Sequence, residues 1–200
     1  MTLLETPRLH CIPITVAMVQ AVFDGNRTDA ERLCDATLPD QWPGRALIEQ
    51  AFSRPWELLR QDPATYLWGC RLLISKELPR QVIGSVVFDK GPDDEGIVEI
   101  AYGVSLPWQG HGYASEATQA VLRWALTEPE VRSVRATTPA WHTASLRIIE
   151  KMGMSLCGRR EHEMFGELLV FEVRGPSKES TDALRAGVCS PTAHSPDRFL

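Results

Sequence analysis

The amino-acid sequence predicts an α/β (α+β) domain in which helices alternate with strands and three strands in the middle of the chain are antiparallel. Two observations predict this fold class. Segments with strand-like and helix-like spacing of apolar residues alternate along most of the chain, and three strand-like segments in its middle are joined only by short turns. The length of 200 residues and the hydrophobic content of 44% suffice for one domain with a substantial core.

The N-terminal part of the chain predicts one strand followed by helices. Residues 8–14 (RLHCIPI) alternate in polarity as a strand does, and the apolar residues of 15–25 have helical spacing until Gly25 ends it. Residues 28–62 again have helical spacing, which is interrupted by Pro39, Pro43 and Pro55. We therefore expect several short helices between residues 28 and 62.

The middle of the chain predicts three successive antiparallel strands. These are the apolar segments 65–75, 81–89 and 96–106. Their separators, KELPR and KGPDDE, contain the proline, glycine and charged residues that are typical of turns.

The following segments predict two helices, a strand and a hairpin. Residues 113–126 carry their apolar side chains mainly on one helical face, as in a helix packed on a sheet. Residues 131–140 predict a strand, residues 143–154 a helix that ends at Gly153, and residues 155–173 a final hairpin.

Two regions differ in composition, and we expect them to differ in order. Residues 1–174 are expected to form the domain. From Gly175 onward the sequence is poor in apolar residues and rich in Ser, Thr, Pro and Gly. Burial there hardly offsets the entropy lost on ordering, so residues 175–200 are expected to form a flexible or loosely docked tail.

Charge, hydropathy and cysteine content exclude several classes of partner. The formal net charge of -5 gives no general attraction for nucleic acid. There is no apolar run of about 18 residues to span a membrane, and the first residues lack the order of a signal peptide, so we expect a cytoplasmic protein. The five cysteines lie far apart without a CxxC pair, and neither a disulfide framework nor a metal site is expected.

The segment QGHGYA, residues 109–114, stands between a predicted strand and a predicted helix. A helix that starts directly after a glycine turn leaves its first amides unpaired, with the positive end of its dipole facing outward. Gly110 and Gly112 carry no side chain, so a diphosphate could approach several amides at once. The alternative is a purely structural turn. A Rossmann site is excluded because Ser115 occupies the third glycine position, and the P-loop pattern is absent.

Residues 109–114 also fit the pattern Q/R-x-x-G-x-G/A, and in this they resemble the acyl-CoA loop of the GNAT acetyltransferases. The longer segment EIAYGVSLPWQGHGYASEATQAVLRWAL resembles the strand, loop and helix of the RimJ/RimL-like branch, which acetylates ribosomal proteins and small molecules. Three further segments resemble that branch in the same order: LLETPRLHCIPI, QVIGSVVF and HTASLRIIEKMGM. The resemblance covers residues 3–173.

This resemblance implies the GNAT acyl-CoA N-acyltransferase fold, a mixed and mostly antiparallel sheet with helices on both faces and a V-shaped splay between two central strands. Here these are the strand that ends near Val104 and the strand around Val134. The pantetheine arm of acetyl-CoA would lie between them, with backbone hydrogen bonds to Val104, and the glycine loop would hold the pyrophosphate. His111 stands where relatives often carry a cation; a solvated loop residue is the alternative. The implied acetyl-CoA site consists of Tyr102, Val104, Gln109, Gly110, His111, Gly112, Tyr113, Ala114, Ser115 and His142, without a metal.

The reaction implied by the resemblance is attack of a neutral amine on a thioester, which needs a proton acceptor and a proton donor. Glu99 alternates with Val98 and Ile100, so it faces away from them; it is the candidate acceptor, or else a structural carboxylate paired with an arginine or an amide. Ser145 is the candidate donor to the leaving thiolate, or else a capping hydroxyl at a helix start.

The sequence departs from the family at three positions. His142 stands where many relatives have Asn, the tyrosine acid of the RimI-like branch falls at Ile149, and a glutamate of that branch falls near Thr137. We therefore expect an acetyl-CoA-dependent N-acetyltransferase acting on a primary amine of a protein N-terminus or a small molecule. Its alternatives are a non-catalytic acyl-CoA-binding or regulatory module and an unrelated α/β domain. A homodimer is possible.

Overall fold

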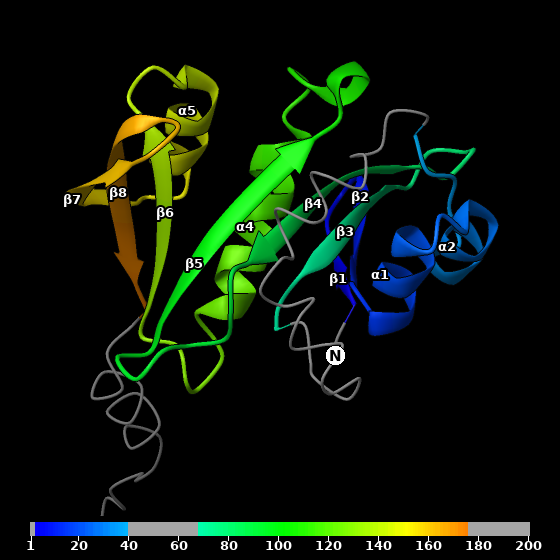
Figure 1. Cartoon of the computed structure of the whole chain (residues 1–200), viewed down its shortest axis with the longest axis horizontal. Helices are drawn as coiled ribbons and strands as arrows, with labels where there is room; N and C mark the ends of the chain where they lie inside the picture. Colours follow the sequence, from blue (N-terminus) through cyan, green and yellow to red (C-terminus); the bar gives the residue numbers. More distant parts are fainter. Residues whose placement is uncertain (1–2, 40–67, 176–200) are drawn as a thin grey trace, which may run out of the picture.

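The computed structural model describes residues 3–39 and 68–175, which form one mixed sheet with helices on both faces (Figure 1). In chain order the elements are β1 (Leu4–Glu5), β2 (Leu9–Pro13), α1 (Val16–Phe23), α2 (Arg27–Cys34), β3 (Arg71–Ser75), β4 (Val82–Phe88), β5 (Ile97–Val104), the 3-10 turn η1 (Leu106–Trp108), α4 (Tyr113–Ala125), β6 (Ser133–Pro139), α5 (Thr143–Lys151), β7 (Ser155–His162) and β8 (Gly166–Arg174). The predicted fold class is confirmed.

The eight strands lie in the order β1-β2-β3-β4-β5-β6-β8-β7. Every neighbouring pair is antiparallel except β5 and β6, which are parallel. These two strands pair only over Ile97–Glu99 and Ser133–Arg135. Beyond this contact, β5 continues to Val104 against β4, while β6 continues to Pro139 against β8. Figure 1 shows β5 and β6 diverging, which confirms the predicted splay.

Two apolar clusters lie on opposite faces of the sheet, because successive strand residues point to opposite sides. Leu73 of β3 belongs to the cluster that contains the apolar face of α4. Its neighbours Leu72 and Ile74 belong to the other cluster, with the apolar residues of α1 and α2. Helices therefore cover both faces, as the resemblance to the GNAT fold implies.

Most predicted elements are present, with adjusted bounds. The strand β1 was not expected from the sequence; it pairs with β2 at only two positions. Of the short helices expected between residues 28 and 62, α2 is confirmed. The remainder of that region, from residue 40, and the tail from residue 176 lie outside the described residues.

One glycine fixes how closely β4 and β5 approach. A Cβ added at Gly84 of β4 would lie 2.2 Å from the backbone oxygen of Gly103 on β5. Both are backbone positions in a paired ladder, so neither strand can yield without shifting the other.

We predict that Gly84→Ala destabilises the domain by about 1–3 kcal/mol, the usual cost of overpacking a filled interior. The measurement is thermal unfolding. The matched control is Gly158→Ala on β7, where an added Cβ would have no atom within 4 Å. Equal melting temperatures for the two variants would contradict the prediction.

Candidate active site

The glycine loop follows β5 and leads directly into α4. Gly110 has φ 79° and Gly112 has φ 84°, which are left-handed angles that favour glycine. Gly112 is also the N-cap residue of α4, where it provides no side chain to cap the first turn. The loop therefore turns sharply, and no side chain of the N-cap residue caps the first amides of α4.

The amides of this loop form a set of unused donors. None of the backbone N–H groups from Gly110 to Ser115 has a hydrogen-bond partner in the part of the chain that the structure describes. They belong to consecutive residues at the start of a 13-residue helix, whose dipole adds positive potential at the same place. Such an arrangement is suited to a phosphate group.

Gln109 and Val104 are joined to each other. The side-chain nitrogen Nε2 of Gln109 donates a hydrogen bond of 2.9 Å to the backbone oxygen of Val104. This bond ties the start of the loop to the end of β5. The side-chain amide of Gln109 therefore helps to fix the conformation of the loop, a role that the sequence pattern alone does not reveal.

Arg8 is a second support of the loop, and sequence reasoning missed it. Its Nε and Nη2 atoms lie 2.7 and 2.6 Å from Oε2 of Glu116 in the first turn of α4. Its Nη1 atom donates to the backbone oxygen of His111 at 3.0 Å, and its guanidinium stacks 4.2 Å from the ring centre of Tyr113. One side chain thus holds both the loop and the helix start.

Glu116 is the anionic half of this support. Burial raises the pKa of its carboxyl group, but hydrogen bonds from the Thr6 hydroxyl and from the backbone and side chain of Arg8 outweigh that effect, so the pKa lies below its usual value. The Thr6 bond is 2.6 Å long. Glu116 is therefore ionised and fixed at neutral pH.

Two cavities meet beside this loop. The loop cavity has a volume of about 370 Å³ and is lined by the glycine loop, the end of β5 and one side of α5. The splay cavity has a volume of about 720 Å³ and lies between β5 and β6. Tyr102, His142 and Ser145 line both cavities. The two spaces therefore join at these three residues.

A pair of hydroxyl groups occupies this junction. Oη of Tyr102, on β5, lies 3.0 Å from Oγ of Ser145, in the first turn of α5. The same phenol also donates to the backbone oxygen of Ser145 at 3.3 Å. Burial raises the pKa of Tyr102, with a smaller opposing effect of the Ser145 hydrogen bond. His142 is the N-cap residue of α5, without a side-chain capping bond.

Glu99 faces the splay cavity, as the strand alternation predicts, while Val98 and Ile100 are buried on the other face. Its Oε1 atom accepts hydrogen bonds from the Thr137 hydroxyl at 2.6 Å and from Nη2 of Arg160 at 2.8 Å. Its Oε2 atom has one longer contact of 3.3 Å, to Nη1 of Arg160. Glu99 therefore pairs with an arginine, which the sequence analysis gave as the alternative to a role as proton acceptor.

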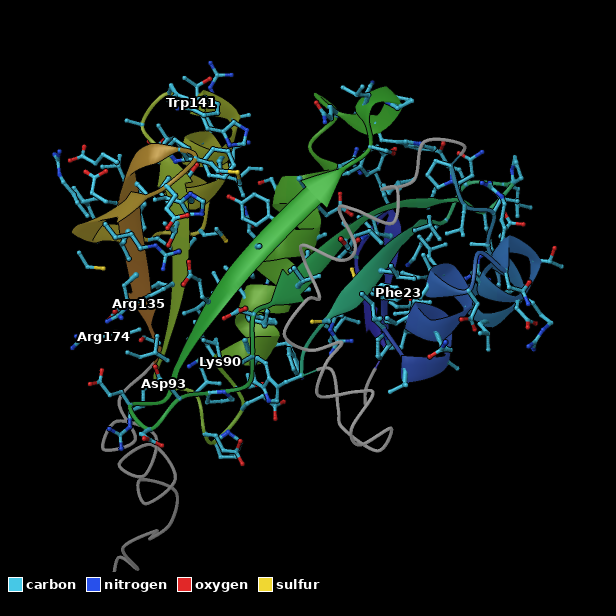
Figure 2. The ribbon with its side chains drawn as sticks, in the orientation of Figure 1. Phe23, Lys90, Asp93, Arg135, Trp141 and Arg174 are labelled. Carbon is cyan, nitrogen blue, oxygen red and sulfur yellow. The ribbon has the colours of Figure 1, made fainter. Side chains whose placement is uncertain are left out.

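Two other polar side chains at the splay cavity have hydrogen-bonding atoms without a partner among the described residues. Asp89, directly after β4, lines the cavity, and its carboxylate has no hydrogen-bond or ionic partner among residues 3–39 and 68–175. The hydroxyl of Thr138 is buried and likewise has no hydrogen-bond partner within those ranges. Trp141 lies at the rim, at the opposite end of the sheet from Lys90 and Asp93 (Figure 2).

The predicted acetyl-CoA residues lie together, with one exception. Those that line the loop cavity are Tyr102, Val104, Gln109, Gly110, Gly112, Tyr113, Ala114, Ser115 and His142. The imidazole of His111 is not part of that lining, and His111 is exposed. Arg147 and Lys151 of α5 do line it, although sequence reasoning did not select them; both lie in the HTASLRIIEKMGM segment and are cations at helical spacing.

Ile149, at the position of the missing tyrosine, is 1% exposed and lies in the core. No cluster of metal-ligating side chains occurs within the described ranges. Nor does any helix among them have the length and hydropathy needed to cross a membrane.

The loop, the helix start and the splayed strands together define an acyl-CoA-binding fold. Residues 8–155 match the family model described as "Acetyltransferase (GNAT) domain", and the chain belongs to that family. It is 26% identical over 156 residues to the uncharacterized N-acetyltransferase YjdG of Bacillus subtilis (strain 168), which covers 78% of this chain and 91% of that protein.

Solved structures share the fold. A ribosomal-protein-S5-alanine acetyltransferase from Vibrio fischeri matches with a TM-score of 0.62 at 11% identity, over 88% of this chain and 98% of that one. A RimL protein acetyltransferase in complex with coenzyme A matches with a TM-score of 0.59 at 13% identity, over 87% and 98%. The predicted family and donor are confirmed: the protein is an acetyltransferase that moves an acetyl group from acetyl-CoA to an amine.

We predict that Gly112→Val abolishes tight binding of acetyl-CoA. Valine is strained at a φ of 84°, and its side chain would extend toward the Arg8 guanidinium, whose Nη2 atom is 3.6 Å from the position of an added Cβ. The measurement is calorimetric titration of the folded variant with acetyl-CoA. Affinity equal to that of the wild type would contradict the assignment of the loop.

We also predict a pH-dependent cost for Glu116→Gln. A carboxylate whose pKa is lowered by folding stabilises the folded state above its usual pKa and loses that contribution as the pH falls through the folded pKa. The melting temperature of the variant should therefore be lower than that of the wild type near neutral pH and converge with it in acid. A difference that stays constant from about pH 7 to about pH 3 would contradict this.

Proposed function

We propose that acetyl-CoA binds with its pyrophosphate on the amides of residues 110–115 and its thioester at the junction of the two cavities. The observation that carries this proposal is the run of unused amides at the start of α4, which opens into the loop cavity. From there the cavity leads along the end of β5 to Tyr102, His142 and Ser145. An arm reaching from the loop to the junction places the acyl group at the entrance of the splay cavity.

The unpaired segments of β5 and β6 support the path of the pantetheine arm. Beyond Glu99 and Arg135 these strands no longer pair with each other. Backbone groups on the facing edges can then bond to amides of the arm, as an added strand would, apart from the backbone oxygen of Val104, which accepts a hydrogen bond from Gln109. Arg147 and Lys151 supply positive charge on the other wall of the loop cavity, where they attract the phosphates.

The acceptor amine would approach through the splay cavity, because this is the second space that reaches the junction. A primary amine that enters there meets the thioester carbonyl opposite the side occupied by the coenzyme. Holding both reactants at one place supplies much of the rate increase without any covalent intermediate on the protein.

Glu99 is the proposed proton acceptor for the amine, through a bound water molecule. A carboxylate offers about four acceptor positions, and the contacts with Thr137 and Arg160 occupy three. Oε2 therefore retains a position that faces the cavity. The Arg160 side chain is 50% exposed and that of Glu99 36% exposed, so their ion pair is weak and yields readily to a bound amine or water.

We predict that Glu99→Gln lowers kcat by about 10²-fold while acetyl-CoA binds normally, because glutamine keeps the shape but removes the basicity. Asp89→Asn is the matched control, since Asp89 lines the same cavity and has no partner to lose among the described residues. The assay follows release of free thiol with a panel of N-terminal peptides, polyamines, amino acids and aminoglycosides.

Two results would overturn parts of this proposal. A large loss in Asp89→Asn with near-normal turnover in Glu99→Gln would move the base to Asp89. Tight binding of acetyl-CoA without transfer to any amine of the panel would instead favour a non-catalytic role for the site.

A further inference from the structure

The departing sulfur of coenzyme A needs a proton when the thioester breaks, and within residues 3–39 and 68–175 three side chains at the junction could supply one. Of the residues that line both cavities, Tyr102 and Ser145 carry hydroxyl groups and His142 carries an imidazole. Ile149, where sequence comparison would place a tyrosine acid, is buried in the core. The donor must therefore be a different side chain.

We propose that the phenol of Tyr102 donates the proton to the coenzyme A thiolate, and that Ser145 is a positioning residue that holds this phenol. This inference rests on the proposed function, because it takes the thioester to lie at the junction of the two cavities.

The geometry fixes the phenol at the junction. Tyr102 packs against the apolar cluster that contains the apolar face of α4, and its ring is partly buried. Its Oη atom is bound to α5 twice, to Oγ of Ser145 at 3.0 Å and to the backbone oxygen of Ser145 at 3.3 Å. Because these contacts join β5 to the first turn of α5, the hydroxyl keeps its place beside the space that both cavities share.

Acidity favours the phenol over the serine. A phenol has a pKa of about 10 and a thiol of about 8.5, so proton transfer from a phenol to a thiolate is nearly balanced, whereas an aliphatic alcohol is a far weaker acid. Burial raises the pKa of Tyr102, so the phenol keeps its proton at neutral pH until the thiolate forms, although the same shift makes the phenol a weaker acid toward sulfur. Ser145 can then donate a hydrogen bond to the phenolate.

The step is balanced in atoms and charge. The amine nitrogen forms a bond to the carbonyl carbon, the carbon–sulfur bond breaks, and sulfur takes the electron pair. The Tyr102 phenol gives its proton to sulfur, which produces free coenzyme A. The phenolate then takes a proton from solvent. The amine releases its proton to solvent through Glu99 and a water molecule, so the number of protons is conserved.

The kinetic test compares Tyr102→Phe with Ser145→Ala. Phenylalanine keeps the ring and its packing, so the variant should fold, which its melting temperature checks. We expect kcat to fall about 10²-fold, the scale of losing a general acid, with little change in the KM for acetyl-CoA and with loss of the alkaline limb of the kcat–pH profile. Ser145→Ala should lose less and should keep that limb. Near-normal turnover in Tyr102→Phe with collapse of Ser145→Ala would assign the donor to Ser145 and overturn the proposal.

A binding measurement tests the proposal without any transfer reaction. A hydrogen bond from the phenol to sulfur stabilises the thiolate, so the thiol of bound coenzyme A should have a lower pKa in the wild type than in Tyr102→Phe. Ultraviolet titration of the complexes, with the spectrum of each free protein subtracted, measures this pKa. An equal thiol pKa in the two complexes would contradict the role of Tyr102 even if no acceptor amine is found, and absence of transfer with a shifted pKa would contradict only the proposed function.

Discussion

The separation of β5 from β6 is the constraint on which the site depends. The two strands share a short parallel ladder at Ile97–Glu99 and then continue against different neighbours. β4 pairs with the end of β5, and β8 pairs with β6 along its whole length. Because each strand is paired on its outer side, the two strands are held apart, and the gap between them supplies both the splay cavity and the route to the loop.

The loop cavity depends on a second set of contacts, which join distant parts of the chain. α4 is anchored by its buried face, in which Ala117, Val121 and Ala125 are fully buried. Its N-terminal turn is held by Arg8 and Thr6 from the start of the chain. These contacts fix the loop from outside, and the amides of residues 110–115, which have no hydrogen-bond partner among the described residues, are the proposed binding groups for the donor. Gln109 adds an internal tie to Val104.

Sequence reasoning found the fold and most of the loop, because both are encoded locally. Alternating polarity placed Glu99 on the cavity face, and the spacing of Gly110 and Gly112 identified a turn before a helix. Sequence reasoning could not identify contacts between residues that are far apart in the sequence and meet only in the folded chain. Arg8 and Glu116 are 108 positions apart, and Tyr102 meets Ser145, 43 positions further along the chain, only because the phenol reaches from β5 to the first turn of α5. The predicted role of His111 has no support from the lining of the cavity, since a loop residue's direction is not encoded in its spacing.

We propose that the donor and the acceptor meet where the two cavities join. A crystal structure of the full chain with coenzyme A tests this most directly. We expect the pyrophosphate on the amides of residues 110–115, the pantetheine arm between β5 and β6, and the sulfur within hydrogen-bonding distance of the Tyr102 phenol. A coenzyme whose sulfur lies away from Tyr102, His142 and Ser145, or whose arm lies outside the splay, would contradict it.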